Sequence, residues 1–195
     1  MSSLVIIIDM WNTHLPEQSN PVAKSIVNFC KSEEVSAVAL ATYGTKCEDE
    51  VQTDQPFFQN SQLFFCDETQ SDTLRRQWNA FSKVQTGLTH KTIANMPLRG
   101  NQVGFVALTA LQILYYCNYI NPSIDKIYVT GLHFDMCLRD RKVGLVELNA
   151  LKNAQMFQST PTILVRTDCT LPVTGTCVFD DKYQQVNSIT YKYLG

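Results

Sequence analysis

Residues 4–8 (LVIII) form a continuous apolar run near the start of the chain, and Asp9 follows it directly. A run rich in β-branched residues, with no polar residue in alternation, is typical of a strand that is buried on both faces. Such strands occur in parallel sheets that helices cover on both sides. The run therefore predicts an α/β domain, with Asp9 at the edge of its sheet.

Similar runs recur along the chain and alternate with segments whose apolar residues fall at helical spacing. We expect strands at residues 35–41, 62–66, 88–92, 126–130 and 162–167, and a helical turn or a last strand at 188–193. We expect helices at residues 21–31, 72–83 and 103–120 and from Cys137 towards Phe157, with a long loop at residues 42–60. This alternation predicts a three-layer Rossmann-like fold, in which a mostly parallel sheet has helices on both faces. The length of 195 residues fits a single domain over residues 1–195.

Several polar residues lie at or just after the ends of predicted strands. In parallel α/β sheets the ligand crevice lies beyond the carboxyl ends of the strands. We therefore expect one group of side chains at this edge of the sheet, made up of Asp9, Lys91, the turn from Gly131 to Cys137, and Asp168.

Composition and charge exclude several classes of partner. The net charge is −2, and no block of Lys and Arg offers a surface for nucleic acid or for an anionic membrane. The 7 cysteines include no CxxC pair, and the N-terminal apolar run is too short for a signal peptide, so we expect free thiols and a cytoplasmic location. Residues 103–120 are apolar, but they contain Thr109, Gln112 and Asn118, which favours a core helix over a membrane span.

Three segments, taken in order, resemble the cysteine-hydrolase branch of the isochorismatase-like superfamily, which includes nicotinamidases and related amidohydrolases. These segments are IIIDMWN with Asp9, LTHKT with Lys91, and YVTGLHFDMCLRDRKVGL with Cys137. The third is the most specific, because it is similar to the family's strand, glycine and helix-opening cysteine with an aspartate two residues before it.

The resemblance implies a catalytic site of Asp9, Lys91 and Cys137. A helix N-terminus and a nearby cation lower a cysteine pKa, so we expect a reactive thiol at Cys137, with Asp9 as the base and Lys91 as its supporting cation. The resemblance also implies a cis peptide bond between Leu132 and His133, and an oxyanion hole made by the backbone N–H groups of His133 and Cys137. It further implies a small-molecule substrate and a homo-oligomer.

Two departures from the family pattern bear on the substrate. Nicotinamidases carry an Asp-x-His pair for a metal after the second strand, where this chain has Tyr43 and Gly44. We therefore expect no metal and no cofactor, and nicotinamide becomes a less favoured substrate. The nearby Cys47, Glu48 and Asp49 are expected to form a solvated acidic loop.

The second departure lies in the turn after Asp9, where Trp11, Asn12, Thr13 and His14 replace the family's common Gln-Asn-Asp-Phe. A changed turn implies a changed pocket wall. The residues expected to bind the substrate are Trp11, His14, Leu132 and His133. His90 is expected to be buried behind the site, because it precedes Lys91 on a predicted strand and so points to the opposite face.

These features leave two functions open. The first is a metal-independent cysteine hydrolase that acts on a small amide or a related acyl compound through Cys137, Asp9 and Lys91. The alternative is a catalytically silent isochorismatase-like protein that serves as a binding or interaction module, which the altered turn and the missing metal ligands favour. Vinyl ether hydrolysis of the isochorismate type is disfavoured, because those enzymes do not use the cysteine.

Overall fold

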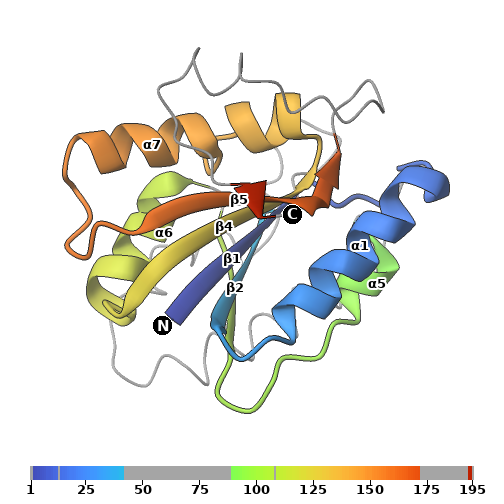
Figure 1. Cartoon of the computed structure of the whole chain (residues 1–195), viewed down its shortest axis with the longest axis horizontal. Helices are drawn as coiled ribbons and strands as arrows, with labels where there is room; N and C mark the ends of the chain where they lie inside the picture. Colours follow the sequence, from blue (N-terminus) through green and yellow to red (C-terminus); the bar gives the residue numbers. More distant parts are fainter. Residues whose placement is uncertain (1, 13, 42–88, 108, 172–192, 195) are drawn as a thin grey trace, which may run out of the picture.

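Six parallel strands form one sheet in the order β3-β2-β1-β4-β5-β6 (Figure 1). The strands are β1 (Ser2–Ile8), β2 (Val35–Ala41), β3 (Val103–Val106), β4 (Ile124–Leu132), β5 (Thr162–Leu171) and β6 (Tyr193–Leu194). The computed structural model describes residues 2–12, 14–41, 89–107, 109–171 and 193–194, without the side chains of Asp135, Tyr193 and Leu194.

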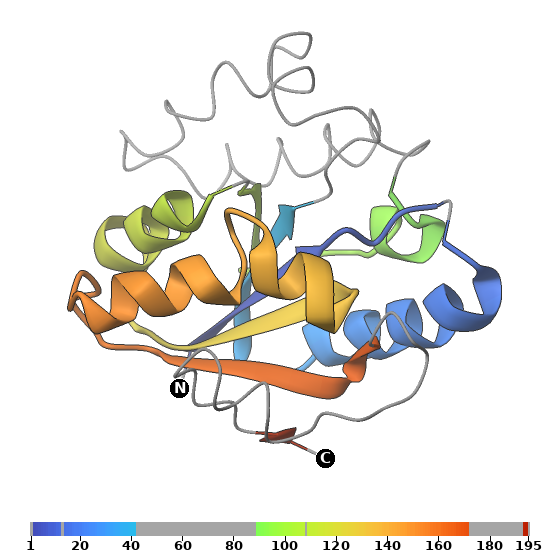
Figure 2. The ribbon, with the colours of Figure 1, turned by 90° about the horizontal axis from the view of Figure 1, so that it is seen from above.

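Helices cover both faces of the sheet, which gives the three-layer α/β fold that the sequence predicts. Figures 1 and 2 show α1 (Pro16–Cys30) and α5 (Lys91–Ala94) on one face, and α6 (Ala110–Tyr115) and α7 (Leu145–Asn153) on the other. On the first face Phe29 packs edge to face on Tyr128, with ring centroids 4.7 Å apart. On the second, Tyr116 stacks on Phe105 at 4.4 Å, within the π-helical turn η2 (Tyr116–Ile120) that continues α6.

The first strand, β1, lies at the centre of the sheet and is buried on both faces. Its residues from Leu4 to Ile8 have no exposed surface, as the apolar run predicts. The chain runs from β1 to β2 on one side and from β4 to β5 on the other, so the sheet reverses its strand order between β1 and β4. Ligands of open α/β sheets bind beyond the carboxyl ends of the strands at such a switch point. The segments after β1 and β4 therefore form the candidate site.

Gly131 lets β4 approach β1 at this switch point. It pairs with Ile8 in the parallel ladder and has a φ of 117°, a value that residues with a Cβ rarely adopt. A Cβ at this position would lie 1.9 Å from the Ile8 carbonyl oxygen. A glycine is thus required where the two strands end.

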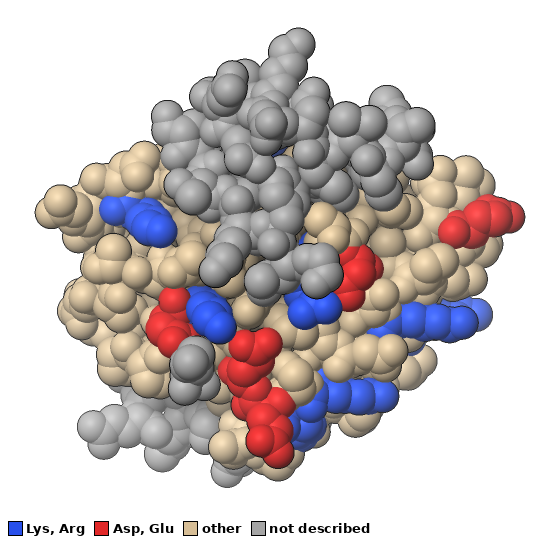
Figure 3. Space-filling view, in the orientation of Figure 1, with Lys and Arg blue, Asp and Glu red and all other residues tan. Residues whose placement is uncertain are grey.

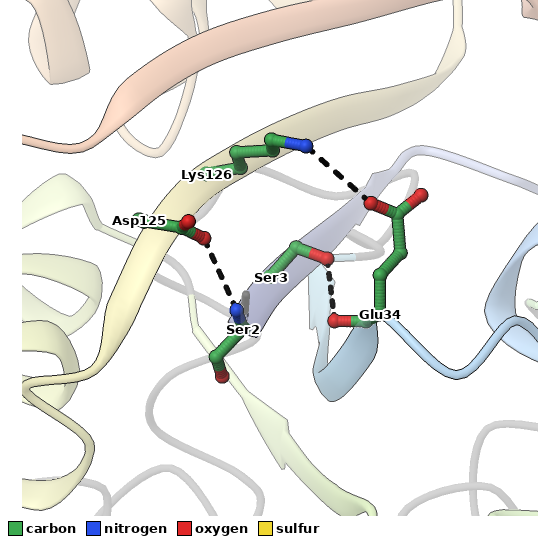
Figure 4. Close-up of polar contacts among 5 residues, drawn as sticks. All are labelled: Ser2, Ser3, Glu34, Asp125 and Lys126. Carbon is green, nitrogen blue, oxygen red and sulfur yellow. Dashed lines mark hydrogen bonds and ion pairs between the residues drawn. The ribbon is translucent and has the colours of Figure 1, made fainter.

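Polar contacts tie the opposite ends of the central strands together (Figure 4). The backbone N–H of Ser2 donates to Asp125 Oδ1 at 3.1 Å, and the Ser3 hydroxyl donates to the Glu34 carbonyl oxygen at 2.7 Å. Lys126 Nζ also lies 3.6 Å from Glu34 Oε2. These contacts join β1 to the starts of β2 and β4, at the edge of the sheet remote from the switch point.

The starts of two helices differ from their predicted positions. The first helix begins at Pro16 and not at Pro21, which lies inside it. The helix predicted over residues 103–120 is wrong in its first part, because Val103–Val106 pairs with β2 as strand β3. The helix begins only after Thr109, which forms a capping box with Gln112.

The segment around Lys91 is not a strand, contrary to the prediction for residues 88–92. Thr89 forms a single antiparallel bridge with Trp11, and the chain then enters the short helix α5. His90 caps this helix, since its Nδ1 accepts a hydrogen bond from the Thr92 backbone N–H at 3.2 Å. A side-chain cap of this kind competes with strand pairing and starts a helix.

The helix predicted from Cys137 towards Phe157 is broken into two parts. Cys137 lies in the π-helical turn η3 (Phe134–Leu138), and α7 begins only after Gly144. The carbonyl oxygens of Leu138, Arg141 and Arg139 occupy the space that a Cβ on Gly144 would need, the nearest at 2.6 Å. The chain therefore folds back on itself between the two parts.

Asp168 lies within β5 and not after it, because the strand continues to Leu171. The pairing of β4 with β5 is irregular here: Val129 pairs with Val165, whereas Gly131 pairs with Thr170. Asp168 is exposed and pairs with Arg166 at 2.9 Å. The expectation that Asp168 ends its strand at the ligand edge is wrong.

Some predicted elements lie outside the described residues: the loop at 42–60, the strand at 62–66, the helix at 72–83 and all but Tyr193 of the segment 188–193. Within the described part, no helix is both long and apolar enough to cross a membrane. Figure 3 shows Lys and Arg side chains interspersed with Asp and Glu on the face in view.

We predict that Gly131→Ala lowers the free energy of unfolding by at least about 2 kcal/mol, because the new Cβ meets the Ile8 carbonyl and the backbone conformation becomes strained. Denaturant unfolding of the full chain measures the change. Gly100→Ala is the matched control, since nothing lies within 4 Å of its Cβ position. Equal stability of the two variants would contradict the close approach of β4 to β1.

Candidate active site

Asp9 is a fully buried carboxylate at the carboxyl end of β1. It has no exposed surface, and its φ of 48° turns the chain out of the strand. A buried charge is costly unless a partner compensates it. Here Arg141 Nε donates to Asp9 Oδ2 at 2.8 Å. The sequence placed Asp9 correctly at the sheet edge, but the structure supplies a partner that the sequence did not suggest.

Cys137 reaches the same point from the turn after β4. Its thiol lies close enough to the Asp9 side chain for the carboxylate to act on the Cys137 pKa through its charge and a hydrogen bond. Burial, followed by the charge of Asp9 and this hydrogen bond, raises the pKa of Cys137 to about 11. A hydrogen bond from the His133 backbone and the positive charge of Arg141 act in the opposite direction but do not outweigh these causes.

The predicted lowering of the Cys137 pKa is therefore wrong. The single π-helical turn does not overcome the loss of water and the facing carboxylate. With a pKa of about 11, only about one thiol in ten thousand is ionised at neutral pH. Any nucleophilic chemistry at Cys137 thus needs a base at the moment of attack, and Asp9 is in contact with the thiol.

The other cysteines within the described ranges have less accessible thiols. Cys30, Cys117 and Cys169 are free and buried, whereas Cys137 is only partly buried. Burial is the main cause that raises the pKa of all three, to about 12 for Cys117 and Cys169. Cys137 therefore has the lowest pKa and the greatest exposure in this group.

Lys91, the expected supporting cation, is not the ion-pair partner that the structure shows for Asp9. Its side chain is exposed in the first turn of α5, and among the described residues it forms no ion pair with Asp9. Arg141 lies four residues after Cys137, and its backbone N–H donates to the Cys137 carbonyl oxygen at 3.1 Å. Residues four apart on a helical turn face the same way. That spacing is the signal in the sequence that could have identified Arg141.

The segment that carries Lys91 is nonetheless attached to the turn after Asp9. The backbone N–H of His90 donates to the Met10 carbonyl oxygen at 2.7 Å, beside the bridge between Thr89 and Trp11. The His90 ring is buried, as expected, and its Nε2 lies 3.0 Å from Asn20 Oδ1. Burial lowers the pKa of His90, and the charge of His14 adds to the effect.

Three of the residues expected to bind substrate form an aromatic cluster beside Asp9. The rings of Trp11 and His14 stack at 5.4 Å, and His133 meets His14 edge on at 5.3 Å. His14 Nε2 donates to the Asp9 carbonyl oxygen at 2.8 Å. The fourth expected residue, Leu132, is fully buried and belongs to the core. The peptide bond between Leu132 and His133 is cis, at the position that the resemblance implies.

No family model, curated protein or solved structure matches this chain.

The acidic segment with Cys47, Glu48 and Asp49 lies outside the described residues. Within those residues, His, Cys, Asp and Glu side chains form no group of three or more that could hold a metal ion. The site is thus built from a thiol, a carboxylate, a guanidinium group and aromatic rings.

We predict that Asp9→Asn speeds the alkylation of Cys137 by iodoacetamide several-fold at about pH 8, because the variant removes a charge and a hydrogen bond that raise the Cys137 pKa. The rate is followed against pH by peptide mass spectrometry. Asp140→Asn is the matched control, since it makes the same charge change at an exposed carboxylate three residues from Cys137. Unchanged or slower alkylation in Asp9→Asn would contradict the contact between Asp9 and Cys137.

Proposed function

We propose that this chain is a cysteine hydrolase of the isochorismatase-like type, acting on a small amide or a related acyl compound. The observation that carries the proposal is the proximity of the Cys137 thiol to the buried Asp9 carboxylate, which Arg141 from the turn of Cys137 contacts at 2.8 Å. The two residues follow neighbouring strands, β1 and β4, at the switch point of the sheet. A nucleophile in direct contact with a base is the arrangement that covalent hydrolysis needs.

The raised pKa of Cys137 determines the order of the proton transfers. Asp9 takes the thiol proton as the sulfur attacks the substrate carbonyl, because a thiol with a pKa of about 11 supplies little thiolate beforehand. The protonated Asp9 then gives this proton to the leaving amine as the C–N bond breaks, which leaves an acyl group on Cys137. Asp9 next takes a proton from water, whose oxygen attacks the thioester carbonyl. As the C–S bond breaks, Asp9 returns this proton to the sulfur, which releases the acid and restores both the thiol and the carboxylate.

Backbone N–H groups near the sulfur supply the expected oxyanion hole. The backbone of His133 lies close enough to the Cys137 side chain to lower its pKa, which supports a role for its N–H beside the reacting sulfur. We assign the developing negative charge to this N–H and to that of Cys137. Trp11, His14 and His133 border the same point and would contact the rest of the substrate.

The alternative is a catalytically silent binding protein that uses the same site. It is favoured by the ion pair between Arg141 and Asp9, which weakens Asp9 as a base, and by the raised pKa of Cys137. The two functions make opposite predictions for one experiment: only the hydrolase forms an acyl group on Cys137 and releases ammonia.

We predict that the full chain releases ammonia from at least one member of a panel of small aliphatic and aromatic primary amides. Cys137→Ala should reduce this release by at least about a thousandfold, since the nucleophile is lost. Cys117→Ala is the matched control, because Cys117 also lies in a π-helical turn but is buried away from Asp9. Coupled ammonia detection measures the rates, and intact mass spectrometry detects the acyl group on Cys137.

The same assay with Asp9→Asn separates catalysis from simple thiol reactivity. Release should fall by at least about a hundredfold, because the amine loses its proton donor, although the thiol itself alkylates faster. If no amide is hydrolysed and Cys137 is never acylated, the chain is the silent binding protein.

A further inference from the structure

We infer that Arg141 is the positioning residue of this site: its guanidinium group keeps the buried Asp9 carboxylate ionised and directed at Cys137. This is the part that the resemblance assigns to Lys91. The inference rests on the proposed function, because it concerns the base of the proposed reaction.

The first argument is the burial of Asp9. A carboxylate without exposed surface takes up a proton readily unless a cation and hydrogen bonds compensate its charge. Arg141 Nε contacts Asp9 Oδ2 at 2.8 Å, and the Arg141 side chain is itself only 26% exposed. The contact is charge-assisted and partly shielded from water, so it holds both the charge and the orientation of the carboxylate.

The second argument is the position of Arg141 in the chain. One turn carries both the nucleophile and the cation, because the Arg141 backbone N–H donates to the Cys137 carbonyl oxygen at 3.1 Å. The Gly144 N–H in turn donates to the Arg141 carbonyl oxygen at 2.6 Å and closes the turn. Cys137 and Arg141 therefore approach Asp9 from the same turn.

Other charged or titratable side chains near the site, among the residues that the structure describes, have different partners or are exposed. Arg139 pairs with Asp140 at 2.6 Å. His14 donates to the backbone oxygen of Asp9, and its ring contacts His133. Lys91 is exposed on α5, and within the described residues it forms no ion pair with Asp9. Arg141 is thus the cation whose ion pair with the Asp9 carboxylate the structure shows.

The test is the pH dependence of Cys137 acylation by p-nitrophenyl acetate, followed by release of nitrophenolate from about pH 5 to 10 with the full chain. In the unchanged protein the rate constant should rise with pH as Asp9 loses its proton and then reach a plateau. The rising part at low pH is the acid limb of the profile. Arg141→Met should move this limb to higher pH by about one unit or more, because the buried carboxylate loses its cation. Arg141→Lys should restore at least half of the shift, since it keeps the charge.

Two matched controls separate positioning from structure. Lys91→Met and Arg139→Met should follow the profile of the unchanged protein, because neither removes the ion pair to Asp9. A merely structural role of Arg141 would lower the melting temperature and leave the acid limb in place. If Arg141→Met is unfolded, Arg141→Lys decides: its ammonium lacks the planar Nε–H, so the plateau rate should fall at least about fivefold.

The outcomes distinguish the inference from the proposed function. Any one of three results overturns the inference and leaves the hydrolase proposal standing. These are an acid limb that stays in place in Arg141→Met, an acid limb that moves in Lys91→Met, and a plateau rate that is not reduced in Arg141→Lys. No acylation of Cys137 in the unchanged protein overturns both.

Discussion

The compensation of one buried charge organises the centre of this molecule. Asp9 lies at the end of the central strand with no exposed surface, so its carboxylate must be paired within the protein. Arg141 provides the ion pair at 2.8 Å, and the Cys137 thiol lies beside the carboxylate from the same turn. The turn after β4 therefore supplies the partner that the buried carboxylate at the end of β1 needs.

The backbone makes this pairing possible. Gly131 pairs with Ile8, and a Cβ in its place would lie 1.9 Å from the Ile8 carbonyl oxygen, so only glycine lets the strands come this close. The chain then folds back at Gly144, whose Cβ position is filled by carbonyl oxygens of the preceding turn. The two glycines bound the segment that presents Cys137 and Arg141 to Asp9.

Burial also decides the state of the nucleophile. The same loss of water that requires an ion pair for Asp9 raises the pKa of Cys137 to about 11, with the facing carboxylate adding to the effect. A thiol in this environment is coupled to its base and does not act as a preformed thiolate. The proposed hydrolysis consequently depends on proton transfer between Cys137 and Asp9, with Arg141 controlling the availability of the base.

The sequence by itself determined the layered α/β fold, the central buried strand and the positions of Asp9 and Cys137 at the sheet edge, because local apolar patterns and strand ends specify them. Tertiary structure decided that Arg141 forms an ion pair with Asp9, and that the Cys137 pKa rises. It also decided that residues 103–106 form a strand. These features depend on which distant segments meet and on how much water they exclude. A local pattern such as the four-residue spacing of Cys137 and Arg141 indicates which side chains lie together on one turn, but it does not determine what that turn meets.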